Sequence, residues 1–124
     1  MVNTTENQKR PRAVLCAVDT GEFDMDYSME ELENLADTAG ADIVAHFVQR
    51  TTRFEPATCI GTGELAELAE FCKNNEIDMV IFNHELTASQ MRNIEDATDV
   101  DVIDRTTLIL DIFAQRAKSA EGRL

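Results

Sequence analysis

The stretch "AVLCAVD" (residues 13–19) is a short apolar run that ends in a carboxylate. A run of this length between polar segments is typical of a buried strand. Three further stretches have the same character: "DIVAHFVQR" (42–50), "DMVIFN" (78–83) and "VDVID" (100–104). The sequence therefore predicts four strands, and the segments between them decide how these strands are joined.

Those connecting segments show helical spacing of apolar residues and recognisable helix ends. Ser28 and Glu31 fit a capping box at the start of the first helix, and Gly40 lies where a terminating glycine belongs. Thr62 is a plausible N-cap for the second helix, and "TASQ" (87–90) is a second capping box. Strands that alternate with helices predict an α/β fold: one small domain with about four mostly parallel strands flanked by helices.

The length of 124 residues fits one domain. Residues 1–12 are polar and are predicted to be a flexible arm, residues 13–104 the α/β domain, and residues 105–124 a helix that follows it. The arm has no apolar core typical of a secretory signal, and no stretch reaches the roughly 18 apolar residues of a membrane span. We therefore expect a cytoplasmic protein.

Charge and cysteine usage narrow the function classes. The net charge of −13 disfavours binding of nucleic acid by the chain as a whole, although a local basic patch stays possible. Eight carboxylates and no Lys or Arg lie between Asp19 and Asp37, which indicates either a solvated acidic face or a site for a metal or a basic partner. Cys16, Cys59 and Cys72 lack the spacing of a disulfide framework or a zinc site, so buried, inert thiols are expected.

The turn Gly61-Thr62-Gly63 precedes a helix and is a candidate phosphate-binding turn. Glycines allow close approach of a phosphate, and a helix N-terminus favours an anion. However, the motif is neither G-x-G-x-x-G nor G-x-x-x-x-G-K-[ST], and Glu64 adds a negative charge there. A structural tight turn is the alternative.

Carboxylates near the ends of the predicted strands form a second candidate site. Asp19, Glu85 and Asp104, with Asp24 and Asp26 nearby, would meet at one edge of a parallel sheet. Such a group could hold Mg²⁺ or Mn²⁺ for a metal-dependent nuclease. Asp104 would serve equally well as the N-cap of the last helix. A further alternative is a nucleotide-sensing domain that binds an adenine nucleotide at this edge.

The last helix, in "VIDRTTLILDIFAQRAKS" (102–119), carries apolar residues around most of its circumference for two turns. A surface helix normally keeps one face polar, so this helix is expected to contact a partner on its outer side. In isolation it could fray, or a second copy of the chain could dimerise through it. The candidate residues for a partner or RNA surface are Arg105, Leu110, Phe113, Arg116, Lys118 and Arg123.

Several stretches together resemble one known family. They are "SMEELENLADTAGADIVAHFVQR", "PATCIGTGELAELAEFC" and "MVIFNHELTASQMRNIEDATDVDVIDRTTLILDIFAQRAKSAEGRL". The chain is similar, from about Ser28 to its last residue, to the N-terminal domain of the HflX family of ribosome-associated GTPases. The most specific part runs from Glu85 to Gly122.

The resemblance implies a non-catalytic module within a larger GTPase. Family members continue into a long helical hairpin and then a P-loop GTPase domain, which holds GTP and Mg²⁺. They bind the large ribosomal subunit through ribosomal RNA and act on stalled or stressed ribosomes in translation. The last helix would then lead toward the hairpin, which would cover its outer face.

Two features depart from the family pattern. The chain ends at Leu124, before any GTP-binding motif, so we expect an excised domain rather than a natural short relative. Family members commonly carry Lys on both sides of the second glycine of the turn, where this chain has Thr62 and Glu64.

Overall fold

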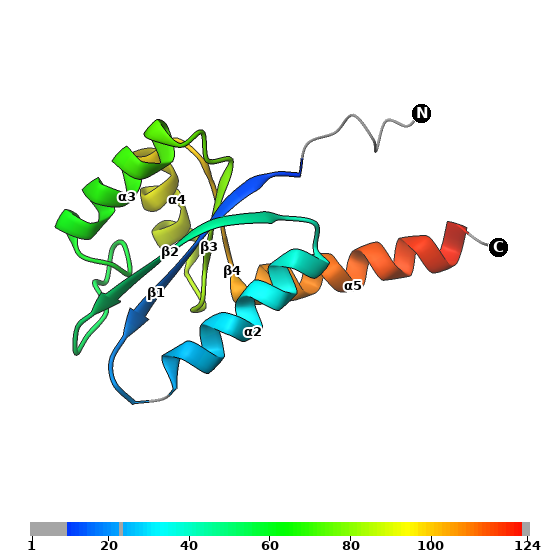
Figure 1. The fold of residues 1–124 in the computed structure, drawn as a ribbon, viewed down its shortest axis with the longest axis horizontal. Coiled ribbons are helices and arrows are strands. Elements are labelled where there is room, and N and C mark those ends of the chain that lie inside the picture. The colour runs from blue at the N-terminus through cyan, green and yellow to red at the C-terminus, as the bar shows by residue number, and fades with distance from the viewer. Residues whose placement is uncertain (1–9, 23, 123–124) are drawn as a thin grey trace.

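Strands and helices alternate along the computed structural model, which describes residues 10–22 and 24–122 (Figure 1). The elements are β1 (Arg12–Asp19), α2 (Met25–Thr38), β2 (Asp42–Arg50), α3 (Thr62–Asn74), β3 (Met79–Phe82), α4 (Ala88–Thr98), β4 (Asp101–Asp104) and α5 (Arg105–Gly122). The four strands form one parallel sheet in the order β2-β1-β3-β4. The predicted α/β fold is confirmed.

The helices form a layer on each face of the sheet, α2 and α5 on one and α3 and α4 on the other (Figure 1). This arrangement explains the uninterrupted apolar run of β1, which lies inside the sheet. Ala13, Leu15 and Ala17 belong to the core on the α2 side, whereas alternate residues such as Val14 and Val18 belong to the core on the α3 side. A strand covered on both faces needs apolar side chains at every position.

The strand order places a topological switch between β1 and β3. The chain leaves β1 through α2 to reach β2, and then crosses β1 through α3 to reach β3. Ligands of open α/β sheets generally bind at the carboxyl ends of the strands beside such a point. Functional residues are therefore expected in the loops that follow β1 and β3.

The start of α2 differs from the prediction. Asp24 is the N-cap, and its carboxylate accepts a hydrogen bond from the Tyr27 backbone N–H at 3.1 Å. The predicted capping box of Ser28 and Glu31 is wrong, because Asp24 caps the helix one turn earlier. Gly40 follows the helix as predicted and has the positive φ of 97° that a terminating glycine adopts.

The remaining boundaries follow the predictions closely. Gly61, and not Thr62, is the N-cap of α3, with Thr62 the first helical residue. The capping box of Thr87 and Gln90 is confirmed, with both reciprocal hydrogen bonds formed. The strand β2 has the predicted bounds, whereas β3 and β4 are shorter by the residues at positions 78, 83 and 100. Residues 1–9 of the predicted arm lie outside the described residues, and its last residue, Arg12, begins β1 instead of belonging to an arm.

The three cysteines behave as buried, free thiols, as expected. They belong to the core on the α3 side of the sheet. Burial raises the pKa of the Cys59 and Cys72 thiols to about 11, and that of Cys16 further still. Since the thiolate is the reactive form, these side chains are suited to packing rather than to chemistry.

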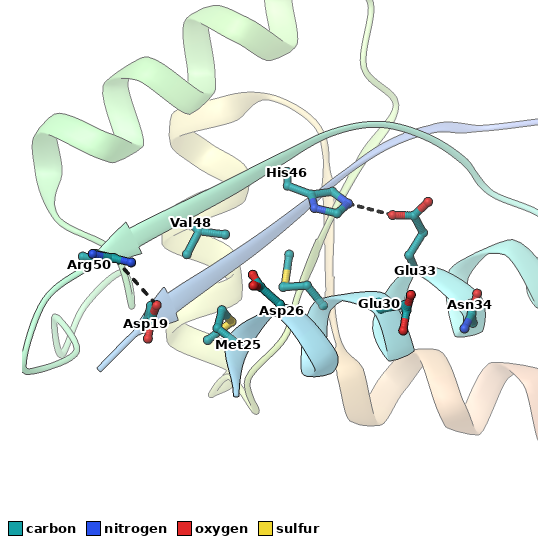
Figure 2. Close-up of a pocket in the computed structure, with 10 residues that line it drawn as sticks. Asp19, Met25, Asp26, Glu30, Glu33, Asn34, His46, Val48 and Arg50 are labelled. Atoms are coloured by element: carbon teal, nitrogen blue, oxygen red, sulfur yellow. Dashed lines mark hydrogen bonds and ion pairs between the residues drawn. The ribbon is translucent and has the colours of Figure 1, made fainter. Parts of the chain in front are cut away.

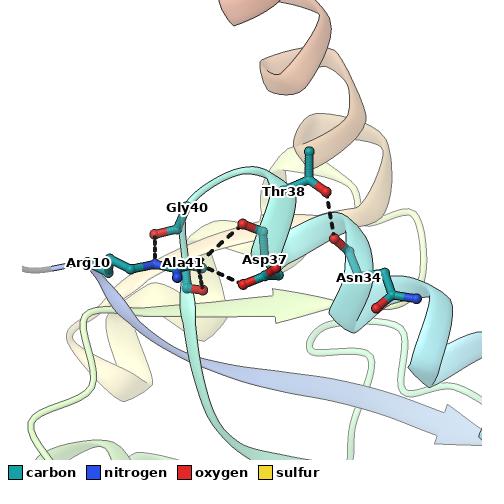
Figure 3. Close-up of polar contacts among 6 residues, drawn as sticks. All are labelled: Arg10, Asn34, Asp37, Thr38, Gly40 and Ala41. Atoms are coloured by element: carbon teal, nitrogen blue, oxygen red, sulfur yellow. Dashed lines mark hydrogen bonds and ion pairs between the residues drawn. The ribbon is translucent and has the colours of Figure 1, made fainter.

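Arg10 closes the carboxyl-terminal end of α2 (Figure 3). Its guanidinium donates hydrogen bonds to the carbonyl oxygens of Asp37, Gly40 and Ala41, at distances between 2.7 and 3.2 Å. It also pairs with the Asp37 carboxylate at 2.9 Å. Asp37 lies in the last turn of α2, and Gly40 and Ala41 lie in the turn that follows it. A cation at this end complements the helix dipole and holds the turn against the helix.

Replacing Arg10 by alanine is expected to lower the free energy of unfolding by about 1 kcal/mol. The effect is modest because the ion pair is largely exposed to solvent. Urea denaturation at low ionic strength measures it. The matched control is Arg53→Ala, which removes an exposed arginine from the loop after β2. Equal stability of the two variants would contradict the capping role.

Candidate functional site

Asp104 ends β4 at the carboxyl edge of the sheet, and its side chain is only 3% exposed. Its Oδ1 accepts a hydrogen bond from the Thr107 backbone N–H at 2.9 Å, which caps α5. Its Oδ2 accepts from the Leu86 backbone N–H at 2.8 Å, which fixes the loop after β3. Both oxygens therefore act within the fold, and the geometry favours the N-cap alternative over metal binding.

The other candidate metal ligands have separate tasks. Asp19 accepts a hydrogen bond from the Gly21 backbone N–H at 2.9 Å and lies 3.9 Å from the Arg50 guanidinium. Asp24 caps α2, and Glu85 is exposed in the loop after β3. Within residues 10–22 and 24–122, no group of three or more His, Cys, Asp or Glu side chains is placed to hold a metal ion. The geometry gives the nuclease alternative no support.

His84 lies beside the topological switch, although the sequence does not single it out. Its Nε2 accepts a hydrogen bond from the Val18 backbone N–H at 2.7 Å, which joins the loop after β3 to the end of β1. Its ring packs edge-on against Phe54, with 4.9 Å between the ring centroids. Because Nε2 is the acceptor, the proton of the neutral ring is on Nδ1. A lone histidine in a loop carries no sequence signal for this role.

The burial of His84 predicts a pH-dependent stability. Burial lowers the pKa of His84 from its ordinary value of 6.5, so the folded state binds fewer protons than the unfolded state below that pH. Stability should therefore fall as the pH falls through 6.5, with a slope from this group of at most about 1.4 kcal/mol per pH unit.

The measurement is chemical denaturation between pH 7.5 and 5.5, a range set by the histidine pKa of about 6.5. The control is His84→Gln, which keeps an acceptor for Val18 but cannot take up a proton. We expect a shallower pH dependence for this variant. Parallel curves for the variant and the original chain would refute the assignment.

A polar cluster around the buried side chain of Asn83 joins the start of α5 to α2 and to the end of β3. Asn83, 7% exposed, donates from Nδ2 to the Ser28 hydroxyl and accepts at Oδ1 from Arg105, each at 2.8 Å. The second guanidinium nitrogen of Arg105 forms an ion pair with Glu31. The sequence pattern assigned Ser28 and Glu31 to a capping box, but in the structure they bind Asn83 and Arg105. Arg105, a candidate for a partner surface, has its guanidinium engaged within the domain.

Two neighbouring side chains lie against Gly61 in the turn Gly61-Thr62-Gly63, whereas Gly63 borders open space. The Gly61 backbone N–H donates to Gln49 Oε1 at 2.9 Å. A Cβ atom at Gly61 would lie 2.9 Å from Glu64 Oε1, so this carboxylate lies directly against the turn. A carboxylate beside the amino-terminal end of a helix repels an anion, so the residues present disfavour a nucleotide phosphate at this turn. The geometry favours the structural alternative.

The helix α5 is covered on one side and open on the other. Leu108 and Ile112 are 3% and 8% exposed and belong to the core shared with α2. Leu110 and Phe113, by contrast, are 61% and 62% exposed. These two residues are called the outer face of α5 below. Of the basic candidates on this segment, Arg116, Lys118 and Arg123 have side chains outside the described part of the chain.

A cleft of about 750 Å³ separates α2 from the edge strand β2 (Figure 2). His46, Val48 and Arg50 line it from β2, and His46 pairs with Glu33 of α2 at 2.8 Å. Its other lining residues come from the end of β1 and from α2: Asp19, Met25, Asp26, Met29, Glu30 and Asn34. Sequence reasoning found the acidic run but not the cleft, because the cleft depends on how far α2 lies from β2.

The fold and these contacts define a class of protein: a small α/β domain with an all-parallel sheet, whose last helix leaves an apolar face exposed. The chain belongs to the family described as GTP-binding GTPase N-terminal, which matches residues 26–114. The resemblance to HflX proteins is confirmed. No helix among the described residues is both long and apolar enough to cross a membrane.

The curated relatives are proteins named GTPase HflX. That of Caldanaerobacter subterraneus subsp. tengcongensis is 45% identical over 115 residues, which are 93% of this chain and 27% of the relative. That of Alkalihalophilus pseudofirmus is 47% identical over 109 residues, 88% of this chain and 26% of the relative. That of Escherichia coli is 40% identical over 105 residues, which are 82% of this chain and 25% of the relative. The chain thus spans about a quarter of the length of these relatives.

A solved structure shares the fold. The GTP-binding protein of the archaeon Sulfolobus solfataricus in complex with GDP aligns with a TM-score of 0.61 and 20% identity. The alignment covers 84% of this chain and 30% of that protein.

Proposed function

We propose that this chain is the N-terminal module of an HflX-like GTPase in the cytoplasm. The module docks on the large ribosomal subunit through ribosomal RNA and couples that contact to a GTPase domain that follows it. The module hydrolyses no GTP itself. The observation that carries this proposal is the outer face of α5, which is exposed on a helix whose start is firmly held.

The anchoring of α5 supports a coupling role. Asp104 caps the helix, and Arg105 joins its first turn to Glu31 and Asn83. A helix fixed at its start transmits the position of the sheet to whatever packs on its outer face. Exposed large apolar residues that lie together commonly mark an interface. We assign this outer face to the helical hairpin and GTPase domain that follow in the relatives; a second copy of the isolated chain is the alternative occupant.

The proposal places GTP and Mg²⁺ in the downstream domain. Within the described chain, Gln49 and Glu64 lie against Gly61, and the Asp104 carboxylate accepts hydrogen bonds from two backbone N–H groups. Adenine nucleotide sensing at the sheet edge stays a prediction, which calorimetry with ATP tests.

The net charge of the chain determines how it can bind RNA. A net charge of −13 opposes the phosphate backbone, so any RNA contact has to come from a local basic patch. Arg116, Lys118 and Arg123 are the candidates, because Arg105 is engaged within the domain. We expect the isolated chain to bind large subunits weakly and with a strong dependence on salt.

Co-sedimentation with purified ribosomal subunits tests the docking step. At a salt concentration of about 50 mM, the chain should pellet with large subunits and not with small ones, and about 200 mM salt should release it. The triple variant Arg116→Ala, Lys118→Ala and Arg123→Ala should pellet less at low salt. Equal recovery with both subunits, or no recovery with either, would remove independent docking from the proposal.

A further inference from the structure

The strand β2 has a free edge, and part of its side facing α2 is exposed. It lies at one end of the sheet order and pairs only with β1 among the described strands. On its α2 side, Val48 is 44% exposed. An edge strand presents unpaired backbone N–H and C=O groups, which are the groups that an added strand would use.

The cleft beside this edge is lined by both apolar and acidic side chains (Figure 2). Met25 and Met29 of α2 line the cleft and are buried. Asp26, Glu30 and Glu33 line it from the same helix. Glu33 pairs with His46, whereas the described residues form no ion pair with Asp26 or Glu30. Arg50 also lines the cleft, but four carboxylates outnumber it, so the cleft keeps a net negative charge next to apolar side chains.

The spacing of these carboxylates fits an extended chain. Residues four apart on a helix are separated by about 6 Å along its axis, which is the offset of Asp26 and Glu30. Alternate residues of a strand are about 6.6 Å apart and point to the same side. A strand added beside β2 would thus direct every second side chain toward this row of carboxylates.

We propose that the cleft and the free edge of β2 bind an extended protein segment rich in lysine and arginine, which joins the sheet as an additional strand. The backbone edge supplies strand pairing, and the carboxylates of α2 select basic side chains at alternate positions. This surface is separate from the outer face of α5, and the inference does not depend on the proposed ribosomal role.

The negative charge of the cleft argues against three other occupants: nucleic acid, a second copy of the chain, and the chain's own first residues. The acidic side chains of the cleft repel the phosphates of nucleic acid. A second copy of the chain would bring the same acidic cleft and a net charge of −13 to the contact. The chain's own residues 1–9 contain one lysine and one glutamate, so they offer no excess of positive charge. A separate basic segment is the occupant that complements the cleft.

Titration of the ¹⁵N-labelled chain with a synthetic peptide of about eight residues, alternating lysine and threonine, tests this inference. Amide signals of β2 and α2 should shift, and hydrogen exchange should slow at those β2 amides that do not bond to β1. A peptide with proline in place of threonine keeps the charge but cannot pair as a strand, and it should bind about tenfold more weakly.

Matched charge reversals locate the site. Asp26→Lys with Glu30→Lys should weaken binding of the lysine–threonine peptide by about tenfold or more. Glu70→Lys with Asp96→Lys makes the same change of net charge on α3 and α4 and should have little effect. Circular dichroism verifies that both variants are folded. The titration of the unaltered chain with the two peptides tests the inference even if a variant does not fold.

Three results would overturn the inference. These are equal binding of the proline peptide, equal weakening by the two reversals, and signal shifts confined to surfaces other than β2 and α2. Tighter peptide binding after removal of residues 1–9 would also count against it, since the chain's own segment would then occupy the cleft.

Discussion

Replacing Asp104 by alanine is expected to lower the free energy of unfolding by about 3 kcal/mol. The substitution removes the N-cap of α5 and leaves the Leu86 backbone N–H without its acceptor in a buried position. Loss of a helix cap costs about 1 kcal/mol, and an unsatisfied buried donor adds about 1–3 kcal/mol. Asp104→Asn should cost less, because its amide oxygen can still accept one of the two hydrogen bonds.

Urea denaturation of the Asp104 variants measures this effect. The control is Asp101→Ala, an exposed carboxylate at the start of the same strand, which should change stability by less than about 0.5 kcal/mol. Adding Mg²⁺ or Mn²⁺ separates the structural role from the metal-ligand alternative. Stabilisation of the original chain by either metal, lost in Asp104→Ala, would contradict the purely structural role of this carboxylate.

Arg105→Ala should be the next most damaging substitution, with a loss of about 2 kcal/mol. It deprives the buried Asn83 oxygen of its donor and breaks the ion pair with Glu31. Glu31 is nearly half exposed, so Glu31→Ala should cost about 1 kcal/mol or less. Arg105→Lys retains the charge but not the planar fork that reaches Asn83 and Glu31 together, so it should rescue only part of the loss.

A double-mutant cycle between positions 31 and 105 tests whether the cluster acts as a unit. The double variant should be more stable than the sum of the single losses predicts, by about 0.5 kcal/mol or more. The control pairs Arg105→Ala with Glu95→Ala on the other helical layer, which should be additive. Additive losses for both pairs would show that Arg105 and Glu31 do not stabilise α5 together.

The sequence predicted the fold because β1 and the connecting helices carry strong periodic signals. Successive side chains of a strand point to opposite faces of the sheet. Because neighbours such as Val14 and Leu15 are both apolar, β1 had to be buried on both faces. The Thr87 capping box was equally clear, since both of its reciprocal partners are local in sequence. Local patterns of this kind depend little on the tertiary structure.

The site was less predictable, because its contacts join residues far apart in the chain. Ser28 and Glu31 satisfied the pattern of a local cap, yet they bind Asn83 and Arg105 across the domain. Asp24, one turn earlier, is the residue that caps the helix. The acidic residues of α2 were visible in the sequence, but the cleft beside β2 depends on the packing of the helix.

The role of Asp104 was also unpredictable, because its position in the sequence fits two different roles. A carboxylate after a strand at the edge of a parallel sheet is the expected position for a metal ligand or for an N-cap, and the sequence favoured neither. The structure decides between them through two backbone donors, Leu86 and Thr107, each within 3 Å of the carboxylate. Only the folded chain brings Leu86 to that position.

The central claim is that this module, through the outer face of α5, couples ribosome docking to a downstream GTPase. The most direct measurement replaces the matching N-terminal segment of GTPase HflX from Alkalihalophilus pseudofirmus by this chain and determines GTP hydrolysis with and without large ribosomal subunits. The two segments are 47% identical over 109 residues. We predict that large subunits stimulate the chimera as they do the unaltered relative, and that Leu110→Glu with Phe113→Glu abolishes the stimulation without changing basal hydrolysis. Stimulation that persists in the double variant, or in the relative without its N-terminal segment, would contradict the coupling role of this module.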